Sequence, residues 1–180
     1  MSEADIGLKR LDFVQPGYGE REEWREVSWL ADALVHHSKI SSVWAQLADV
    51  NQPGRSSAEV QEVFLEHASE LGFVDESKGL FDNYTSSALR PDYYRPVGDT
   101  GVIWEVERGK TTINNMDLLD FWKCHICEHA SYLFLMVPRE LRQNPTMSPR
   151  REFETVRKRL ESFFVPGNYT NVHGLVLLGY

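Results

Sequence analysis

Cysteine is scarce in this chain, with Cys124 and Cys127 the two among 180 residues. Two cysteines do not make the disulfide framework of a small secreted protein, so we expect a cytoplasmic, reducing location. No apolar run approaches the roughly 18 residues that a membrane helix needs, so we expect no membrane partner. The first ten residues, MSEADIGLKR, do not contain the apolar core of a secretory signal.

An excess of positive charge is also absent, because 27 acids outnumber 19 lysines and arginines and leave a net charge of −8. The charge is uneven along the chain. Residues 1–77 hold 15 acids against 6 bases, whereas residues 78–180 hold 12 acids against 13 bases. Seven of these bases lie between Arg139 and Leu160, beside three acids. This segment predicts a local basic surface, although such a run is also typical of a solvated helix face.

Hydrophobic residues make up 42% of the chain, which is ample for one packed domain. Apolar spacings of three and four predict helices at residues 20–40, 41–50, 57–71, 114–130 and 149–164. Apolar runs bounded by turn residues predict strands at 79–84, 89–95, 101–108, 131–138 and 171–180, the first two as a hairpin. The order indicates an α/β fold with a mixed central sheet flanked by helices. We expect a helical extension over residues 1–52, beginning with a lead-in over 1–19, and the core over 53–180.

Three acids lie in or beside the apolar runs of RPDYYRPVGDTGVIWEVERGK, residues 90–110. Side chains two apart on a strand share a face, so Glu105 and Glu107 are expected to point the same way. A turn near residues 98–101 would bring Asp92, on the preceding strand, beside Glu105. Such carboxylates repel one another, and a divalent cation such as Mg²⁺ offsets that cost. Ordinary ion pairs at an exposed strand end are the alternative interpretation.

This arrangement resembles the PD-(D/E)xK nuclease superfamily, whose fold is restriction-endonuclease-like. RPDYYRP supplies Pro91 and Asp92, WEVERGK supplies Glu105 and Glu107, and the elements over residues 57–137 follow the family's order. The resemblance implies a Mg²⁺- or Mn²⁺-dependent endonuclease of restriction type that hydrolyses nucleic acid, with DNA expected first. It makes Asp92 and Glu105 metal ligands. Glu107 stands where the family normally has lysine, as in relatives with an E-x-E motif, and is expected to assist the metal or the water.

The lysine's part would then fall to Lys110, at the strand's end, or to Lys123, on the following helix. Either residue would orient or deprotonate a water or stabilise phosphate charge. The family often adds a glutamate from the first core helix, which here is Glu59. A capping box between Ser56 and Glu59 is the structural alternative for that residue.

The predicted nucleic-acid contacts fall into two groups. One group follows the acidic strand, near a helix N-terminus that favours anions, and comprises Arg108, Thr111, Asn114 and Asn115. The other lies in the basic helix and comprises Arg150, Arg151 and Arg157. Cutting both strands of a duplex would favour a homodimer.

Two other functions compete with the nuclease. One is a catalytically inactive module that binds nucleic acid or a protein, with Trp24, Trp29 and Leu30 as the docking surface. The other is a zinc site in CHICEH, formed by Cys124 and Cys127 with a neighbouring histidine. A second pair of ligands with zinc spacing is missing from the sequence, so zinc is the weaker interpretation.

Overall fold

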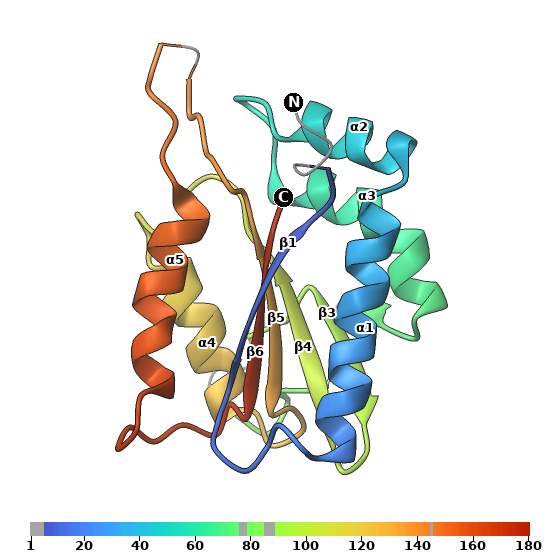
Figure 1. Cartoon of the computed structure of the whole chain (residues 1–180), viewed down its shortest axis with the longest axis vertical. Coiled ribbons are helices and arrows are strands. Elements are labelled where there is room, and N and C mark those ends of the chain that lie inside the picture. Colours follow the sequence, from blue (N-terminus) through green and yellow to red (C-terminus); the bar gives the residue numbers. More distant parts are fainter. Residues whose placement is uncertain (1–5, 76–78, 85–88, 145) are drawn as a thin grey trace.

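The computed structural model describes residues 6–75, 79–84, 89–144 and 146–180, and its centre is a sheet with strand order β1-β6-β5-β4-β3-β2 (Figure 1). The strands are β1 (Lys9–Val14), β2 (Val74–Asp75), β3 (Tyr93–Val97), β4 (Thr100–Val106), β5 (Tyr132–Val137) and β6 (Gly174–Gly179). The helices are α1 (Glu22–Ser38), α2 (Ser41–Val50), α3 (Ser57–Glu70), α4 (Met116–Ile126) and α5 (Glu152–Glu161), followed by a 3-10 turn at Ser162–Phe164. This confirms the predicted mixed sheet flanked by helices.

Strands β4, β5 and β6 are parallel, and β1, β3 and β2 extend the sheet antiparallel on either side. Helix α4 connects β4 to β5, and α5 connects β5 to β6. Both helices therefore begin where the parallel strands end, at what we call the C-terminal edge of the sheet. Figure 1 shows α4 and α5 on one face and α1, α2 and α3 on the other. The carboxylates discussed below lie at this edge.

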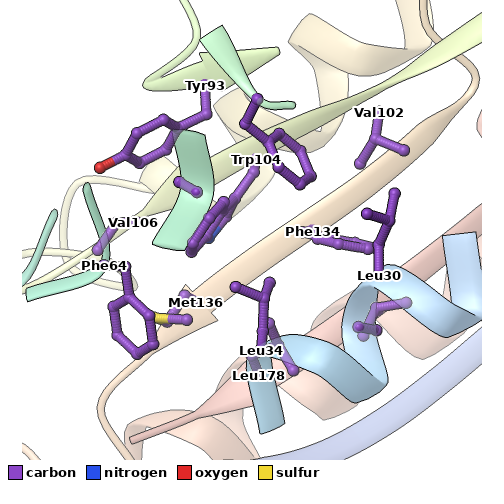
Figure 2. Close-up of a cluster of buried hydrophobic side chains, with 14 of the residues drawn as sticks. Leu30, Leu34, Phe64, Tyr93, Val102, Trp104, Val106, Phe134, Met136 and Leu178 are labelled. Carbon is purple, nitrogen blue, oxygen red and sulfur yellow. The ribbon is translucent and has the colours of Figure 1, made fainter. Parts of the chain in front are cut away.

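Alternation along β4 explains why its side chains divide between two cores. Trp104 faces α1 and α3, where it packs edge-on against Phe64 (Figure 2). Ile103 faces α4 and α5 in the second core, together with Phe153. Glu105 has the same phase as Ile103 and therefore points toward α4. The predicted phase of this strand is confirmed.

Some predicted elements were wrong. Residues 79–84 form turns rather than a strand, so the predicted hairpin of residues 79–84 with 89–95 does not form. Residues 85–88, between these two segments, lie outside the described part of the chain. The hairpin is made by β3 and β4 instead, around Gly98 and Asp99, with Gly98 at a φ of 54°. A tight turn of this kind favours glycine because its φ is positive.

The lead-in over residues 1–19 contains β1, which sequence reasoning missed. It pairs with β6, and residues of α1 join the same core as the sheet, so part of the predicted extension 1–52 belongs to the central layers. The docking surface on α1 was also wrong, because Trp24 and Leu30 are buried and only Trp29, at 57% exposure, faces solvent. None of the described helices is both long enough and apolar enough to cross a membrane.

Candidate functional site

Lys123 is buried on the inner face of α4, one turn after Asp120. Its Nζ lies 2.6 Å from Glu105 Oε1 and 3.2 Å from Asp120 Oδ1. It also donates to the backbone carbonyl of Arg90 at 3.3 Å. Of the two predicted lysines, the structure therefore brings Lys123 to the acidic strand, whereas Lys110 is exposed.

Asp92 lies one residue before β3 and directly beside Glu105. The amide of Val106 donates to Asp92 Oδ2 at 2.7 Å, and the amide of Asp92 donates to Glu105 Oε2 at 3.3 Å. The side chain of Gln61, from α3, lies near enough to the Asp92 carboxylate to lower its pKa, although burial has the larger effect and raises it. The predicted proximity of Asp92 and Glu105 is confirmed, and the first core helix contributes an amide here.

Glu107 follows β4 and is held by its backbone. Its amide donates to the carbonyl of Met136 at 2.8 Å, and its carbonyl accepts from the Tyr180 hydroxyl at 3.0 Å. Burial, followed by the charges of Asp120 and Asp92, raises the pKa of Glu107 to about 8. Glu107 therefore belongs with the other three acids, and we call Asp92, Glu105, Glu107 and Asp120 the carboxylate cluster.

The carboxylate cluster is electrostatically costly. Burial raises the pKa of Asp92 and is the largest cause of that shift. It is also the largest cause that raises the pKa of Glu105 well above its usual range and the pKa of Asp120 to about 6. Burial alone would lower the pKa of Lys123, but the charges of Glu105 and Asp120 outweigh it and raise that pKa. Lys123 is the base that the described contacts bring to these acids.

The donors of the cluster suit a hard divalent cation, because all are carboxylate oxygens and Asp120 Oδ2 is buried without a hydrogen-bond partner. Within the described ranges, however, no three acidic, histidine or cysteine side chains are arranged to hold one metal ion. Lys123 instead offsets part of the charge of Glu105 and Asp120. A divalent cation at this place would have to share Glu105 with Lys123 or displace the lysine.

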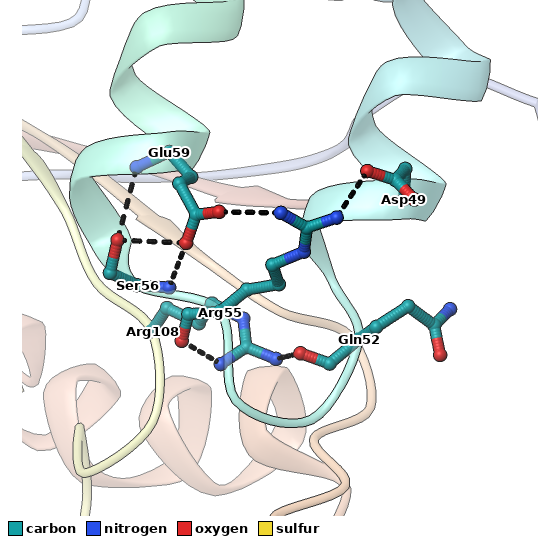
Figure 3. Close-up of polar contacts among 6 residues, drawn as sticks. All are labelled: Asp49, Gln52, Arg55, Ser56, Glu59 and Arg108. Atoms are coloured by element: carbon teal, nitrogen blue, oxygen red, sulfur yellow. Dashed lines mark hydrogen bonds and ion pairs between the residues drawn. The ribbon is translucent and has the colours of Figure 1, made fainter.

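Two predicted residues serve a neighbouring structural network (Figure 3). Glu59 completes the capping box with Ser56 and pairs with Arg55 at 2.8 Å, so the capping alternative describes what its side chain does. The Arg108 guanidinium donates to the backbone carbonyls of Arg55 and Gln52. No contact joins Glu59 to the carboxylate cluster in the described residues.

The nucleic-acid contacts predicted between β4 and α4 differ in how exposed they are and in what they bond. Thr111 is buried, whereas Asn114 is exposed. Asn115 occupies the N-cap position of α4 at a φ of 58° but makes no capping bond with its side chain. Its Oδ1 accepts from Arg159 at 2.6 Å instead. The left-handed backbone turns the side chain of Asn115 toward α5 rather than toward the first amides of α4.

The bases of α5 and its approach are less available than their sequence suggests. Arg150 bonds Thr112 at 2.6 Å and lies 3.3 Å from Glu152. Arg157 pairs with two acids of its own helix, at 3.0 Å and 2.9 Å. Arg151 is exposed. Of the three predicted phosphate contacts, two are therefore already engaged inside the chain.

The two cysteines are free and buried, and burial raises the pKa of both thiols. His125 Nδ1 accepts from the amide of Asn171 at 3.0 Å, which ties α4 to the segment before β6. Together with the missing ligand group noted above, this leaves the zinc interpretation without support among the described residues.

Sequence reasoning missed Asp120 and Gln61. Asp120 had an available signal, since it precedes Lys123 by three positions and shares its helix face. Gln61 had none, because it is an uncharged residue on a helix 31 positions before Asp92.

Neither the family models nor the curated proteins contain a match to this chain. Among solved structures, the chain is similar to the restriction endonuclease BglII complexed with a DNA 16-mer. The two share 12% identity with a TM-score of 0.46, over 97% of this chain and 78% of that one.

Proposed function

We propose that this protein is a divalent-metal-dependent phosphodiester hydrolase that cleaves nucleic acid, with DNA as the first expected substrate and restriction-type cleavage as the expected mode. The observation that carries the proposal is the contact of Lys123 with Glu105 inside the carboxylate cluster. Four acids and one lysine gather at the end of β4, where Glu105, Asp120 and Lys123 are buried and Asp92 and Glu107 are half-buried. Such a cluster costs stability. Function is the better reason for such a cluster.

Asp92, Glu105 and Glu107 would hold the cation, and the orphan oxygen of Asp120 offers a further donor. When bound, Mg²⁺ or Mn²⁺ polarises a phosphate and lowers the pKa of a water. Lys123, with its raised pKa, stays protonated and suits the stabilisation of phosphate charge rather than proton abstraction. Glu107 would assist the cation or the attacking water from the same face of the strand.

The test is incubation with plasmid DNA, single-stranded DNA and RNA, in Mg²⁺ or Mn²⁺ and in EDTA. Cleavage should need the metal and should fall at least 100-fold in Glu105→Gln, since general catalytic groups contribute on the order of 100-fold or more. Glu22→Gln, an exposed acid at the start of α1, is the matched control and should cleave normally. Equal cleavage by Glu105→Gln, or none by the unmodified protein on any substrate, would contradict the proposal.

A second candidate is a binding module without catalysis. It is favoured by the absence of a three-residue metal-ligand arrangement among the described residues and by the neutralisation of Glu105 by Lys123. Such a module would bind nucleic acid equally well in EDTA and in Mg²⁺ and would leave it intact.

Sedimentation of the protein with and without duplex, in the same buffers, tests the homodimer that double-strand cleavage favours.

A further inference from the structure

A second charged feature lies on α5 and the edge strand β1. Four bases line a surface hollow of about 600 Å³ together with two acids. The bases are Lys9, Arg139, Arg151 and Lys158, and the acids are Glu140 and Glu154. We call this hollow the basic groove. Its excess of positive charge contrasts with the net charge of −8 on the whole chain.

The basic groove shares a face and an edge of the sheet with the carboxylate cluster. Across the sheet, Lys9 on β1 pairs with Gly179 on β6, and Gly179 pairs with Val137 on β5. Two residues before Val137 on the same strand is Leu135, which pairs with Glu105 on β4. Paired residues, and residues two apart, point to the same face. The Lys9 Nζ accordingly lies 4.5 Å from the centre of the Phe153 ring on α5, the same layer that carries Lys123 on α4.

The distance between the two features suits a polynucleotide. Strands β4 and β1 are three spacings apart, since β5 and β6 lie between them. At about 4.8 Å per spacing this is about 14 Å. One strand of a duplex advances about 3.4 Å along its axis per phosphate, so a segment of a few nucleotides is long enough to reach from one strand of the sheet to the other.

The four bases of the basic groove differ in how free they are to bind an external anion. Arg151 and Lys158 are exposed and form no ion pair in the described part of the chain. Lys9 pairs with Glu154 at 2.7 Å, but both side chains are at least 40% exposed, so the pair is weak and open to competition. The Arg139 guanidinium is held by the carbonyls of Gly179 and Gly7 at the wall of the groove.

The other bases of this region are less suited to an external anion. Arg159 lies 3.3 Å from the buried carboxylate of Asp117, and Arg157 is held by acids on either side along α5. Their charges are neutralised within the chain. Lys158 on α5 and Arg151, the residue before its first turn, therefore carry uncompensated charge to the surface.

We infer that the basic groove binds the phosphodiester backbone of the nucleic acid whose cleaved bond would lie at the carboxylate cluster. This rests on the proposed function, which supplies a polynucleotide at the C-terminal edge of the sheet. The groove contributes affinity and orientation without reading bases, because its groups are cations that meet phosphate.

The experiment measures binding of a labelled duplex and a labelled single strand in Ca²⁺ over a range of salt concentrations. The variant is Arg151→Gln with Lys158→Gln. The matched control is Arg21→Gln with Arg25→Gln, two exposed bases at the start of α1. That end is remote from the groove, since Arg21 lies over Tyr18, which stacks on His173 just before β6. Thermal unfolding of all proteins checks that the variants fold.

The groove variant should flatten the dependence of log Kd on log salt by about two units, at about 0.9 per phosphate contact, and the control should not. Equal slopes in both double variants would overturn the groove while leaving the hydrolase proposal in place. Displacement of the duplex by millimolar inorganic phosphate from the unmodified protein, but not from the groove variant, would assign the groove to a small anion instead.

The two proposals fail in distinguishable ways. Groove-dependent binding without cleavage in Mg²⁺ or Mn²⁺ would support the groove and overturn the hydrolase. Absence of polynucleotide binding by the unmodified protein at low salt would overturn both. Cleavage with the salt slope flattened in the groove variant alone would support both.

Discussion

The ammonium of Lys123 lies 2.6 Å from a carboxylate oxygen of Glu105, and both side chains are at most 8% exposed. The lysine comes from α4 and the glutamate from β4, so the contact joins the helix to the sheet through charge. A buried ion pair of this kind contributes little net stability, but breaking it on one side leaves an uncompensated charge. This asymmetry makes the contact easy to test.

Replacing Lys123 with Met should lower the free energy of unfolding by about 3 kcal/mol, because Glu105 and Asp120 lose their cation. Urea unfolding at pH 7 in EDTA measures the change. Adding Glu105→Gln to Lys123→Met should restore part of the loss, since the unpaired charge is removed. Lys110→Met, at an exposed position, should change stability by less than about 0.5 kcal/mol. If both lysine variants were equally stable, the buried pair would not form.

The raised pKa of Glu107 predicts how the metal-free protein responds to pH. Between its ordinary value of 4.5 and about 8, the folded protein binds more protons at Glu107 than the unfolded chain does. The free energy of unfolding should therefore fall as pH rises through this range, by up to about 1.4 kcal/mol per pH unit for one proton. Glu107→Gln should make the decline shallower, as measured by urea unfolding in EDTA, whereas Glu22→Gln should not.

A pair of stacked histidines predicts a response of the opposite sign. His37 on α1 and His67 on α3 have ring centres 4.0 Å apart. Burial, then the charge of His67, lowers the pKa of His37, against the opposing charges of Glu70 and Glu66. Stability from the neutral ring is present above the unfolded pKa of about 6.5 and is lost as pH falls below it. His37→Gln should flatten this loss in unfolding experiments from pH 7 to 5. His36→Gln, its exposed neighbour, should leave the slope unchanged.

The capping box of α3 separates a structural role from a catalytic one. Ser56→Ala should lower the free energy of unfolding by about 1 kcal/mol, because the amide of Glu59 loses its acceptor. Ser56→Asp should retain most of the stability, since aspartate also caps helices. Glu59→Gln should leave cleavage per folded molecule unchanged. A loss of cleavage in Glu59→Gln without a loss of stability would return this residue to the active site.

The parts of the site that sequence could predict depend on neighbours along the chain. Asp92 and Glu105 meet because a short turn joins their strands, and alternation alone places Glu105 on the face of α4. Lys123 was one of two candidates, and choosing between them needed the packing of α4 against the sheet. Helical phase offered that choice in principle, because Asp120 and Lys123 share a face.

The parts that sequence could not predict depend on contacts between distant residues. Arg108 reads as a surface base, yet its guanidinium meets carbonyls of Gln52 and Arg55, more than 50 positions earlier. Arg159 likewise meets the buried carboxylate of Asp117 on α4, a contact that folding alone creates. The partners of Arg157, by contrast, lie three and four positions away on its own helix. Strand β1 had the alternation of Leu11 and Phe13 as its signal, and it was too short to stand out without its partner.

The pairing of β1 with β6 also constrains when the sheet can be completed during synthesis. Lys9 pairs with Gly179, so β1 waits for the roughly 170 residues between the two to be made. At about 5 to 20 residues per second, the ribosome needs roughly 10 to 30 s to supply the partner. Meanwhile β1 carries apolar side chains and open hydrogen-bonding groups, as any unpaired strand does. Lys9, Arg10 and Asp12 place charge along that strand and disfavour pairing with other nascent chains until β6 emerges.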